Sequence, residues 1–418
     1  MKCLRALVLN LLLLGAVTHP VESQTWEMRG NLRGWVRGFT AEPNAIDLTQ
    51  TRLKIELLSG FGEHAAFFSR LHLIHDSKLG DEISWDLKQA YIDYYTDWLT
   101  LRFGRQIISW GKADEINPTD ILNPQDLSNF LEDKIDRKIG LFTVKADWLL
   151  YGFELQTIWK PEYEMMKFPD QDSNWGLMSS NAPLMVVPDH SHLNMDQTDW
   201  AVKLSKTFGL YDFSLGYANA LEYIPTRHYL PDTTGSSSFI PADILRADMI
   251  GFDFAGSVAT VGLWGEAGYF ITDDVDGNNP LVKNPYIQFV LGSDYTFPHS
   301  IKINVQYFQE YITKVDDEIE EKAEEALFSK LGIMIPLKQA VTTRIGKTFG
   351  FGEAHSIEFF GIYDLKDEGY MVGPKLTLSP QDAVKFEFGA MFFDGKKDVL
   401  FGRFKDNDVI YVKGIYSF

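Results

Sequence analysis

The last nine residues of the chain constrain its fold more than any other segment. From Ile410 to Phe418 every second residue is apolar apart from Gly414, and the alternate positions hold Tyr411, Lys413 and Ser417, with Ile415 as the exception. A period of two predicts a β-strand with one apolar face. The strand runs to the aromatic residue that ends the chain, so we expect it to lie at the edge or seam of a sheet.

The N-terminal segment has the features of an exported protein. Residues 1–23 consist of a basic start, an apolar stretch from Ala6 to Val17 and the small residue Ser23 at the expected cleavage point, the order found in secretory signal peptides. The C-terminal strand resembles the signature read by the barrel-assembly machinery of Gram-negative bacteria. We therefore predict a signal peptide over 1–23 and one outer-membrane barrel domain over 24–418, which would contact outer-membrane lipids and lipopolysaccharide.

Composition excludes several classes of function. The net charge of −19 disfavours nucleic acid as a partner. The one cysteine, Cys3, lies in the predicted signal peptide, so we expect no disulfide, no thiolate metal site and no cofactor. The nine histidines include the enzyme candidates His75–Asp76, His190–Ser191–His192 and His228, but no catalytic motif surrounds them. We therefore predict a protein that is not an enzyme.

About eighteen strand-like segments alternate with short and long connections. The long connections are at about 40–48, 76–84, 110–135, 160–197, 224–245, 271–284, 312–338 and 394–406. Short turns on one side and long loops on the other are typical of bacterial outer-membrane barrels. The fold predicted is all-β, a transmembrane antiparallel β-barrel of about 18 strands with long extracellular loops. A large β-sandwich, with its apolar face inside, is the alternative.

Alternation within the strands assigns charged residues to the inside of the barrel. Arg29, Arg33 and Arg37 share a parity, and each would cost roughly 2–4 kcal/mol on a lipid face near the midplane. The predicted basic lumen residues are Arg29, Arg33, Arg37, Arg52, Lys54, Arg70, Arg102 and Lys413, and the predicted acidic ones are Asp93, Glu154, Asp253, Glu266, Asp294 and Glu358. These charges either select solutes through a transverse field or only pair and hydrate a wide lumen.

One internal segment carries a distinctive motif. Two Asn-Pro pairs, at 117–118 and 123–124, are each followed two residues later by aspartate. Proline fixes φ, and Asn and Asp close local turns, so a rigid loop is expected. If this loop folds inward it narrows the lumen, and Asp114, Glu115, Asp120 and Asp126 would face Arg102 or Arg105. The alternatives are a loop that only stabilises the rim, and constriction by the longer loop 160–197.

The same motif resembles that of a known family. Gly104-Arg-Gln106, the run Trp110-Gly-Lys-Ala-Asp114, the two Asn-Pro-x-Asp segments and the C-terminal strand are similar to the signature of the alginate-export-like porins of Gram-negative bacteria. The resemblance implies a single-chain barrel of about eighteen strands that passes a solute across the outer membrane. It does not imply alginate, because the predicted lumen mixes acids with bases.

Two further segments permit local predictions. The run 273–279 has acids spaced by two before a glycine but lacks the closing glutamate of a calcium loop, so a solvated turn is expected rather than a metal site. Apolar residues recur every four positions over 319–331 and predict a short loop helix. The function predicted is a porin for a polar or charged small solute, and a non-conducting adhesin or anchor is the alternative.

Overall fold

The computed structural model describes residues 25–418 apart from 42–45, 78–81, 129–130, 171–172, 177–183, 187–197, 224–225, 228–238, 278–281, 315–336 and 397–398. The predicted signal peptide and the predicted loop helix over 319–331 both lie outside the described residues. No α-helix in the described part of the chain has the length and hydropathy of a bilayer-spanning helix.

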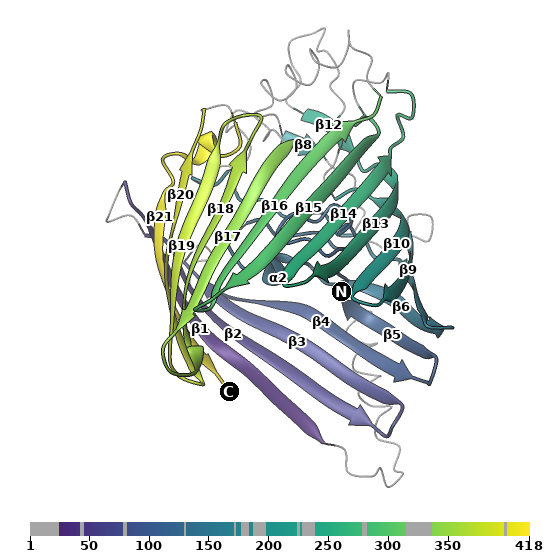
Figure 1. The fold of residues 1–418 in the computed structure, drawn as a ribbon, viewed down its shortest axis with the longest axis horizontal. Helices are drawn as coiled ribbons and strands as arrows, with labels where there is room; N and C mark the ends of the chain where they lie inside the picture. Colours follow the sequence, from purple (N-terminus) through teal and green to yellow (C-terminus); the bar gives the residue numbers. More distant parts are fainter. Residues whose placement is uncertain are drawn as a thin grey trace.

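Eighteen antiparallel strands form one closed sheet, which confirms the predicted fold (Figure 1). The strands are β1 (Trp26–Phe39), β2 (Ile46–Phe61), β3 (Ala65–Asp76), β4 (Ile83–Tyr95), β5 (Leu99–Gln106), β6 (Leu141–Leu150), β7 (Phe153–Lys160), β9 (Asp199–Phe208), β10 (Tyr211–Leu221), β13 (Arg246–Val258), β14 (Val261–Ile271), β15 (Tyr286–Phe297), β16 (Ile301–Ile312), β17 (Gln339–Phe349), β18 (His355–Asp364), β19 (Tyr370–Gln381), β20 (Val384–Asp394) and β21 (Val409–Ser417). Each pairs with the next along the chain, and β21 pairs with β1.

The seam between β1 and β21 closes the barrel. Trp35 pairs with Lys413 in the register of these strands. Beyond the last register pair, the amide of Gly30 donates to the carbonyl of Phe418 (2.9 Å), and the Phe418 amide donates to the Gly30 carbonyl (3.0 Å). Backbone pairing therefore continues to the last residue. A closed sheet leaves no row of unpaired backbone groups, which is a requirement for strands in a bilayer.

The outer surface of the barrel is apolar. Along β21 and the residue that follows it, Ile410, Val412, Tyr416 and Phe418 are all exposed, whereas Lys413 is buried. Similar exposed apolar residues occur on other strands, as Leu32, Leu215 and Leu291 illustrate. Aromatic side chains near strand ends, including Trp26, Trp98, Phe297 and Tyr311, are exposed as well. An apolar band flanked by aromatic residues is the outer face of a barrel that lies in a lipid bilayer.

The remaining elements lie in the connections between the barrel strands. β8 (Leu184–Val186), β11 (Thr226–Arg227) and β12 (Phe239–Asp243) form a small separate sheet, and Figure 1 shows β8 and β12 beyond the ends of the barrel strands. The connection from β5 to β6 contains the short helix α2 (Lys134–Arg137). Two single turns of 3-10 helix, η2 (Phe351–Glu353) and η3 (Gly402–Phe404), lie in the connections after β17 and β20.

Candidate functional site

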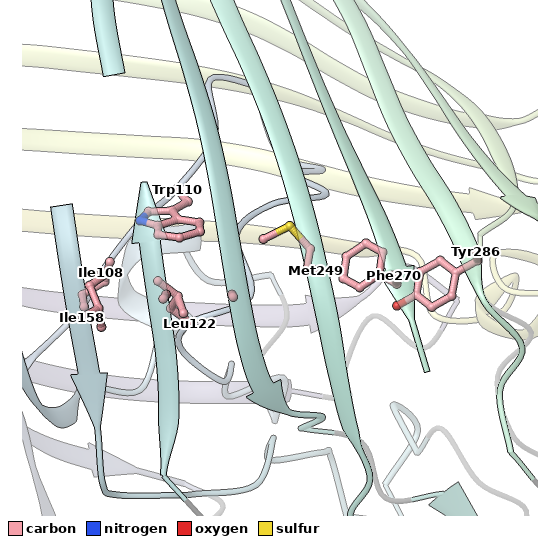
Figure 2. Close-up of a cluster of buried hydrophobic side chains, with 9 residues drawn as sticks. Ile108, Trp110, Leu122, Ile158, Met249, Phe270 and Tyr286 are labelled. Carbon is pink, nitrogen blue, oxygen red and sulfur yellow. The ribbon is translucent and has the colours of Figure 1, made fainter. Parts of the chain in front are cut away.

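The connection between β5 and β6, residues 107–140, is here called the inner loop, and its described residues, 107–128 and 131–140, occupy the interior of the barrel. Its residues Ile108, Trp110 and Leu122 are buried in one apolar cluster with inward side chains of β7, β9, β10, β13, β14 and β15. Figure 2 shows these side chains in a row across neighbouring strands, with Ile108 and Ile158 at one end, Trp110 and Leu122 next to them, and Phe270 beside Tyr286 at the other end. Apolar burial of this kind keeps water out of this side of the lumen.

A carboxylate on the barrel wall anchors the first part of the inner loop. Glu266 on β14 is 2% exposed and accepts hydrogen bonds from the backbone amides of Lys112 (3.0 Å), Ala113 (3.2 Å) and Thr119 (2.6 Å). A Cβ at Gly111, where φ is +87°, would lie 2.2 Å from the Glu266 carboxylate. The loop can wrap around this carboxylate because residue 111 has no side chain and glycine readily adopts positive φ.

The Asn-Pro motif organises the inner loop from within. The Asn123 carboxamide accepts from the Ile108 amide (2.7 Å) and donates to the Ile139 carbonyl (2.8 Å), which joins the two ends of the loop. Asp120 forms a buried ion pair with Lys138 (2.6 Å). Asp120 belongs to the first Asn-Pro-x-Asp segment and Asn123 to the second, so side chains of the motif stabilise a compact loop.

On the β1–β2 side the inner loop is attached by charge. Both carboxylate oxygens of Glu132 accept from the Arg33 guanidinium at 2.7 Å, and one of them also accepts from Arg52 at 2.8 Å. These three side chains are 4–9% exposed. Burial alone would raise the pKa of Glu132, but the charges of Arg33 and Arg52 lower that pKa to about 2. The carboxylate therefore remains ionised at neutral pH.

The loop tip contacts the opposite wall, on β16–β18. The backbone of Asp114 exchanges two hydrogen bonds with the Gln306 carboxamide on β16, at 2.9 and 2.7 Å. Arg344 on β17 donates to Asp114 (3.1 Å), Glu115 (3.0 Å) and Glu358 of β18 (2.9 Å). The inner loop thus spans the barrel from β1–β2 to β16–β18.

A cavity of about 340 Å³ lies between the loop tip and this wall, lined by Asp114, Lys302, Asn304, Arg344, Gly346 and Glu358. Elsewhere many inward side chains are buried, for example His72 on β3, Gln106 on β5 and Val290 on β15. In a water-filled lumen such side chains would be exposed. The inner loop therefore fills much of the barrel, and the cavity marks a polar space left beside it.

The predicted basic lumen residues all have acidic partners. Arg37 pairs with Asp47. Arg29, Lys54 and Arg70 surround Glu56 at 2.8, 3.5 and 2.7 Å. Lys413 lies over the Trp35 ring, 4.2 Å from its centroid, and its ammonium group is 3.9 Å from Glu387. Arg33 and Arg52 are bound to Glu132 as described above, so many of these charges have local neutralising partners.

The expectation that the loop acids face Arg102 or Arg105 is wrong. Arg102 pairs with Asp93 on the neighbouring strand, at 2.6 Å. Arg105 donates to the Leu87 carbonyl (2.7 Å) and lies 3.5 Å from Glu162. Asp114 and Glu115 cross to Arg344 on β17, whereas Asp120 and Asp126 find partners within the loop, so none of the four contacts Arg102 or Arg105.

The other predicted acids are distributed around the wall. Asp253 accepts from Ser214 (3.0 Å), Asp294 pairs with Lys302 (2.8 Å), and Glu154 is exposed. Of the four acids predicted on the loop, Asp126 is engaged locally and accepts from the Ser128 amide (3.0 Å). Glu132, Gln306, Arg344 and Lys375, which lies 3.2 Å from Glu358, were not among the predicted site residues. Strand parity was a usable signal for Gln306, Arg344 and Lys375, whereas Glu132 lies in a loop and carries no such signal.

The alternative loop, 160–197, is described in part. Trp175 stacks on Phe39 (5.9 Å between ring centroids), and its indole nitrogen donates to Asp47 (2.9 Å). With Phe393, Phe401 and Phe404 these rings form a second apolar cluster at the end of the barrel that carries the long connections. This part of the loop packs at the rim of the barrel, beside the inner loop.

The run 273–279 and the histidine enzyme candidates lie only partly within the described residues. In the described part of the run 273–279, the Gly277 amide donates to the Asp274 carbonyl (3.1 Å), and Asp276 lies 4.0 Å from Lys314. Among the enzyme candidates, Asp76 accepts from Gln50 (3.0 Å). His190, His192 and His228 lie outside the described residues.

Comparison with known proteins identifies no family. No protein-family model matches the chain, and no curated protein matches it. Among solved structures, it is similar to a triple mutant of the Rhodopseudomonas blastica porin, with 13% identity over 94% of this chain and 100% of that one, and a TM-score of 0.42. It is also similar to a loop-deletion mutant of OmpT, an outer membrane protein of Vibrio cholerae, with 11% identity over 95% and 100% of the chains and a TM-score of 0.43. These values are too low to support a functional conclusion, and the fold rests on the strand pairing itself.

Proposed function

We propose that this chain is a non-enzymatic channel of the Gram-negative outer membrane that passes a small polar or charged solute. The observation that carries the proposal is the cavity beside the inner loop, which is lined by acidic, basic and amide side chains from β16, β17, β18 and the loop itself. A lumen that served only as packing would bury such groups or replace them with apolar residues. The apolar exterior and the closed seam support the membrane location.

Membership of the alginate-export-like porins is part of the proposal. Of the segments that carry the resemblance, Gly104-Arg-Gln106 is the end of β5, directly before the inner loop, and the two Asn-Pro-x-Asp segments stabilise the loop from within. We further propose cleavage after Ser23, assembly through the C-terminal strand that ends at Phe418, and contact with outer-membrane lipids and lipopolysaccharide. An anionic polymer is disfavoured as cargo, because bases and acids line the cavity together.

The second candidate is a non-conducting anchor or adhesin. Burial of inward side chains around much of the barrel favours it, since the inner loop packs against both sides of the lumen. A narrow passage along β16–β18 would conduct ions, whereas a barrel that the loop closes completely would not.

Conductance in planar lipid bilayers separates the two candidates. The purified, folded protein should give discrete single-channel steps in potassium chloride. Gly346→Leu should reduce their amplitude, because no atom other than Ile357 O, at 4.0 Å, lies near the position of a Cβ at residue 346. Gly60→Ala at the end of β2, where a Cβ would also meet nothing within 4 Å, is the control that should conduct normally. Absence of conductance in correctly folded protein would refute the channel.

A further inference from the structure

We infer that the cavity between the inner loop and β16–β18 selects zwitterionic solutes, with free α-amino acids as the chemical class. This inference rests on the proposed channel function and adds the solute class to it.

Two kinds of ion pair are present inside the barrel. The Arg33–Glu132 and Arg52–Glu132 pairs have side chains that are 4–9% exposed. At the cavity, by contrast, Arg344 is 28%, Asp114 35% and Glu358 26% exposed. A solute can compete only for groups that it can reach, so the pairs at Glu132 hold the loop while those at the cavity are open to exchange.

The accessible charges alternate along a chain of contacts. Lys375 lies 3.2 Å from Glu358, Glu358 lies 2.9 Å from Arg344, and Arg344 lies 3.1 Å from Asp114. Lys302, whose side chain is 59% exposed, adds an ammonium group on β16. The chain therefore presents donors and acceptors in turn, and a solute that brings one of each can replace a protein group at both of its ends.

Charge balance explains why singly charged solutes should be less favoured. The cavity lining contains two carboxylates, Asp114 and Glu358, and two cations, Lys302 and Arg344. An anion that takes Arg344 from Asp114 breaks the 3.1 Å ion pair of that carboxylate, and a cation that takes Glu358 removes the acceptor that Arg344 and Lys375 share. A zwitterion supplies both partners, so no charge is left unpaired in a confined space of lowered dielectric.

The dimensions suit a small solute. A volume of about 340 Å³ is at the lower end of the range for small-molecule sites, which runs from roughly 300 to 1,000 Å³. Gly346 leaves the wall open between Arg344 and the end of β17 at the β17–β18 turn, because nothing but one carbonyl at 4.0 Å approaches the position of its missing Cβ. Asn304 adds a side chain that both donates and accepts hydrogen bonds.

The test compares two solutes of nearly equal size in liposome swelling, the zwitterion L-alanine and the uncharged lactamide. For the native protein we expect L-alanine to enter several-fold faster. The double variant Arg344→Gln with Glu358→Gln removes one charge of each sign, with a side chain of equal size at residue 358 and a shorter one at residue 344, so the two solutes of nearly equal size should then enter at equal rates. Glu353→Gln is the matched control, since Glu353 lies in the β17–β18 turn and binds Thr348 (2.7 Å) away from the cavity.

The outcomes separate the inference from the proposed function. Equal entry of both solutes through the native protein, or entry of neither in a protein that conducts ions, would overturn the zwitterion inference and leave the channel standing. A preference for L-alanine that survives in the double variant would overturn its assignment to this cavity. Absence of both conductance and swelling would refute the channel itself. Gly346→Leu should lower the rate of L-alanine entry without removing a charge. It therefore tests the assignment to this cavity if the double variant folds poorly.

Discussion

Substitution of Glu132 by glutamine tests whether charge holds the inner loop against β1 and β2. The pKa of Glu132 is about 2, against 4.5 for the free side chain, and a difference of this size corresponds to about 3 kcal/mol of interaction with the ionised form. Removing one partner of a buried ion pair costs roughly 3–5 kcal/mol by general experience, so the two magnitudes agree. Arg33 and Arg52 would keep their charges and lose their nearest shared carboxylate, and only Asp136, at 3.7 and 3.3 Å, would remain between them.

We expect Glu132→Gln to release the segment 131–138 from the wall for part of the time. Single-channel recordings at neutral pH should then show additional conductance levels above the main one, because the loop no longer closes this side. Asp133→Asn is the matched control: Asp133 is the exposed neighbour of Glu132, and its side chain makes no capping bond to α2. The Asp133→Asn variant should show the same conductance levels as the native protein.

The pH dependence has a defined sign. A lowered pKa in the folded state means that the contribution of Glu132 is fully present above pH 4.5 and is lost as the pH falls towards 2. The native protein should therefore acquire the extra conductance levels only in strong acid, whereas Glu132→Gln shows them at pH 7. If Glu132→Gln has the same conductance levels as the native protein at pH 7 and the same resistance to urea, the attachment of the inner loop to β1 and β2 does not depend on this carboxylate.

Three further predictions concern stability. Gly111→Ala should displace the loop from Glu266, because the new Cβ would lie 2.2 Å from a carboxylate oxygen and residue 111 has a φ of +87°. The variant should show a lower urea midpoint of unfolding and an altered conductance. Gly60→Ala, where a Cβ meets no atom within 4 Å, is the control. Trp110→Ala should cost about 3–5 kcal/mol in unfolding free energy, because a buried indole that also donates to Gln156 (2.7 Å) is lost; a change below 1 kcal/mol would contradict the packing of the loop. Leu215→Lys, on the outward face of β10, should cost roughly 2–4 kcal/mol if it lies near the midplane, while Leu210→Lys in the adjoining turn should cost at most about 1 kcal/mol; equal effects would argue against a bilayer around β10.

The barrel was predictable because its information is local. Leu32 and Val36 alternate with Arg33 and Arg37, and a period of two is visible within any single strand. In the structure the first pair is exposed on the outside and the second is buried inside. The pairing at the seam could also be anticipated, since the first and last of an even number of strands run antiparallel and can pair when the sheet closes.

The interior was much less predictable. The path of the inner loop depends on contacts such as that between Asp114 and Gln306, which are 192 residues apart in the chain. Strand parity alone assigns Arg33 and Arg344 equally to the inside, yet one is sealed under Glu132 and the other borders a cavity. No periodic signal could have ranked them, because the difference depends on where the loop lies.

By itself the sequence determined the strands, the orientation of their faces and the rigid character of the loop, since all three depend on alternation, proline geometry and side chains close to one another in the chain. The tertiary structure alone decided which charges are structural and which remain accessible. Glu132 is a loop acid like Asp114, but packing places one beneath two arginines and the other beside a cavity. The physical reason is that burial and ion-pair partnership are set by the whole barrel closing around the loop.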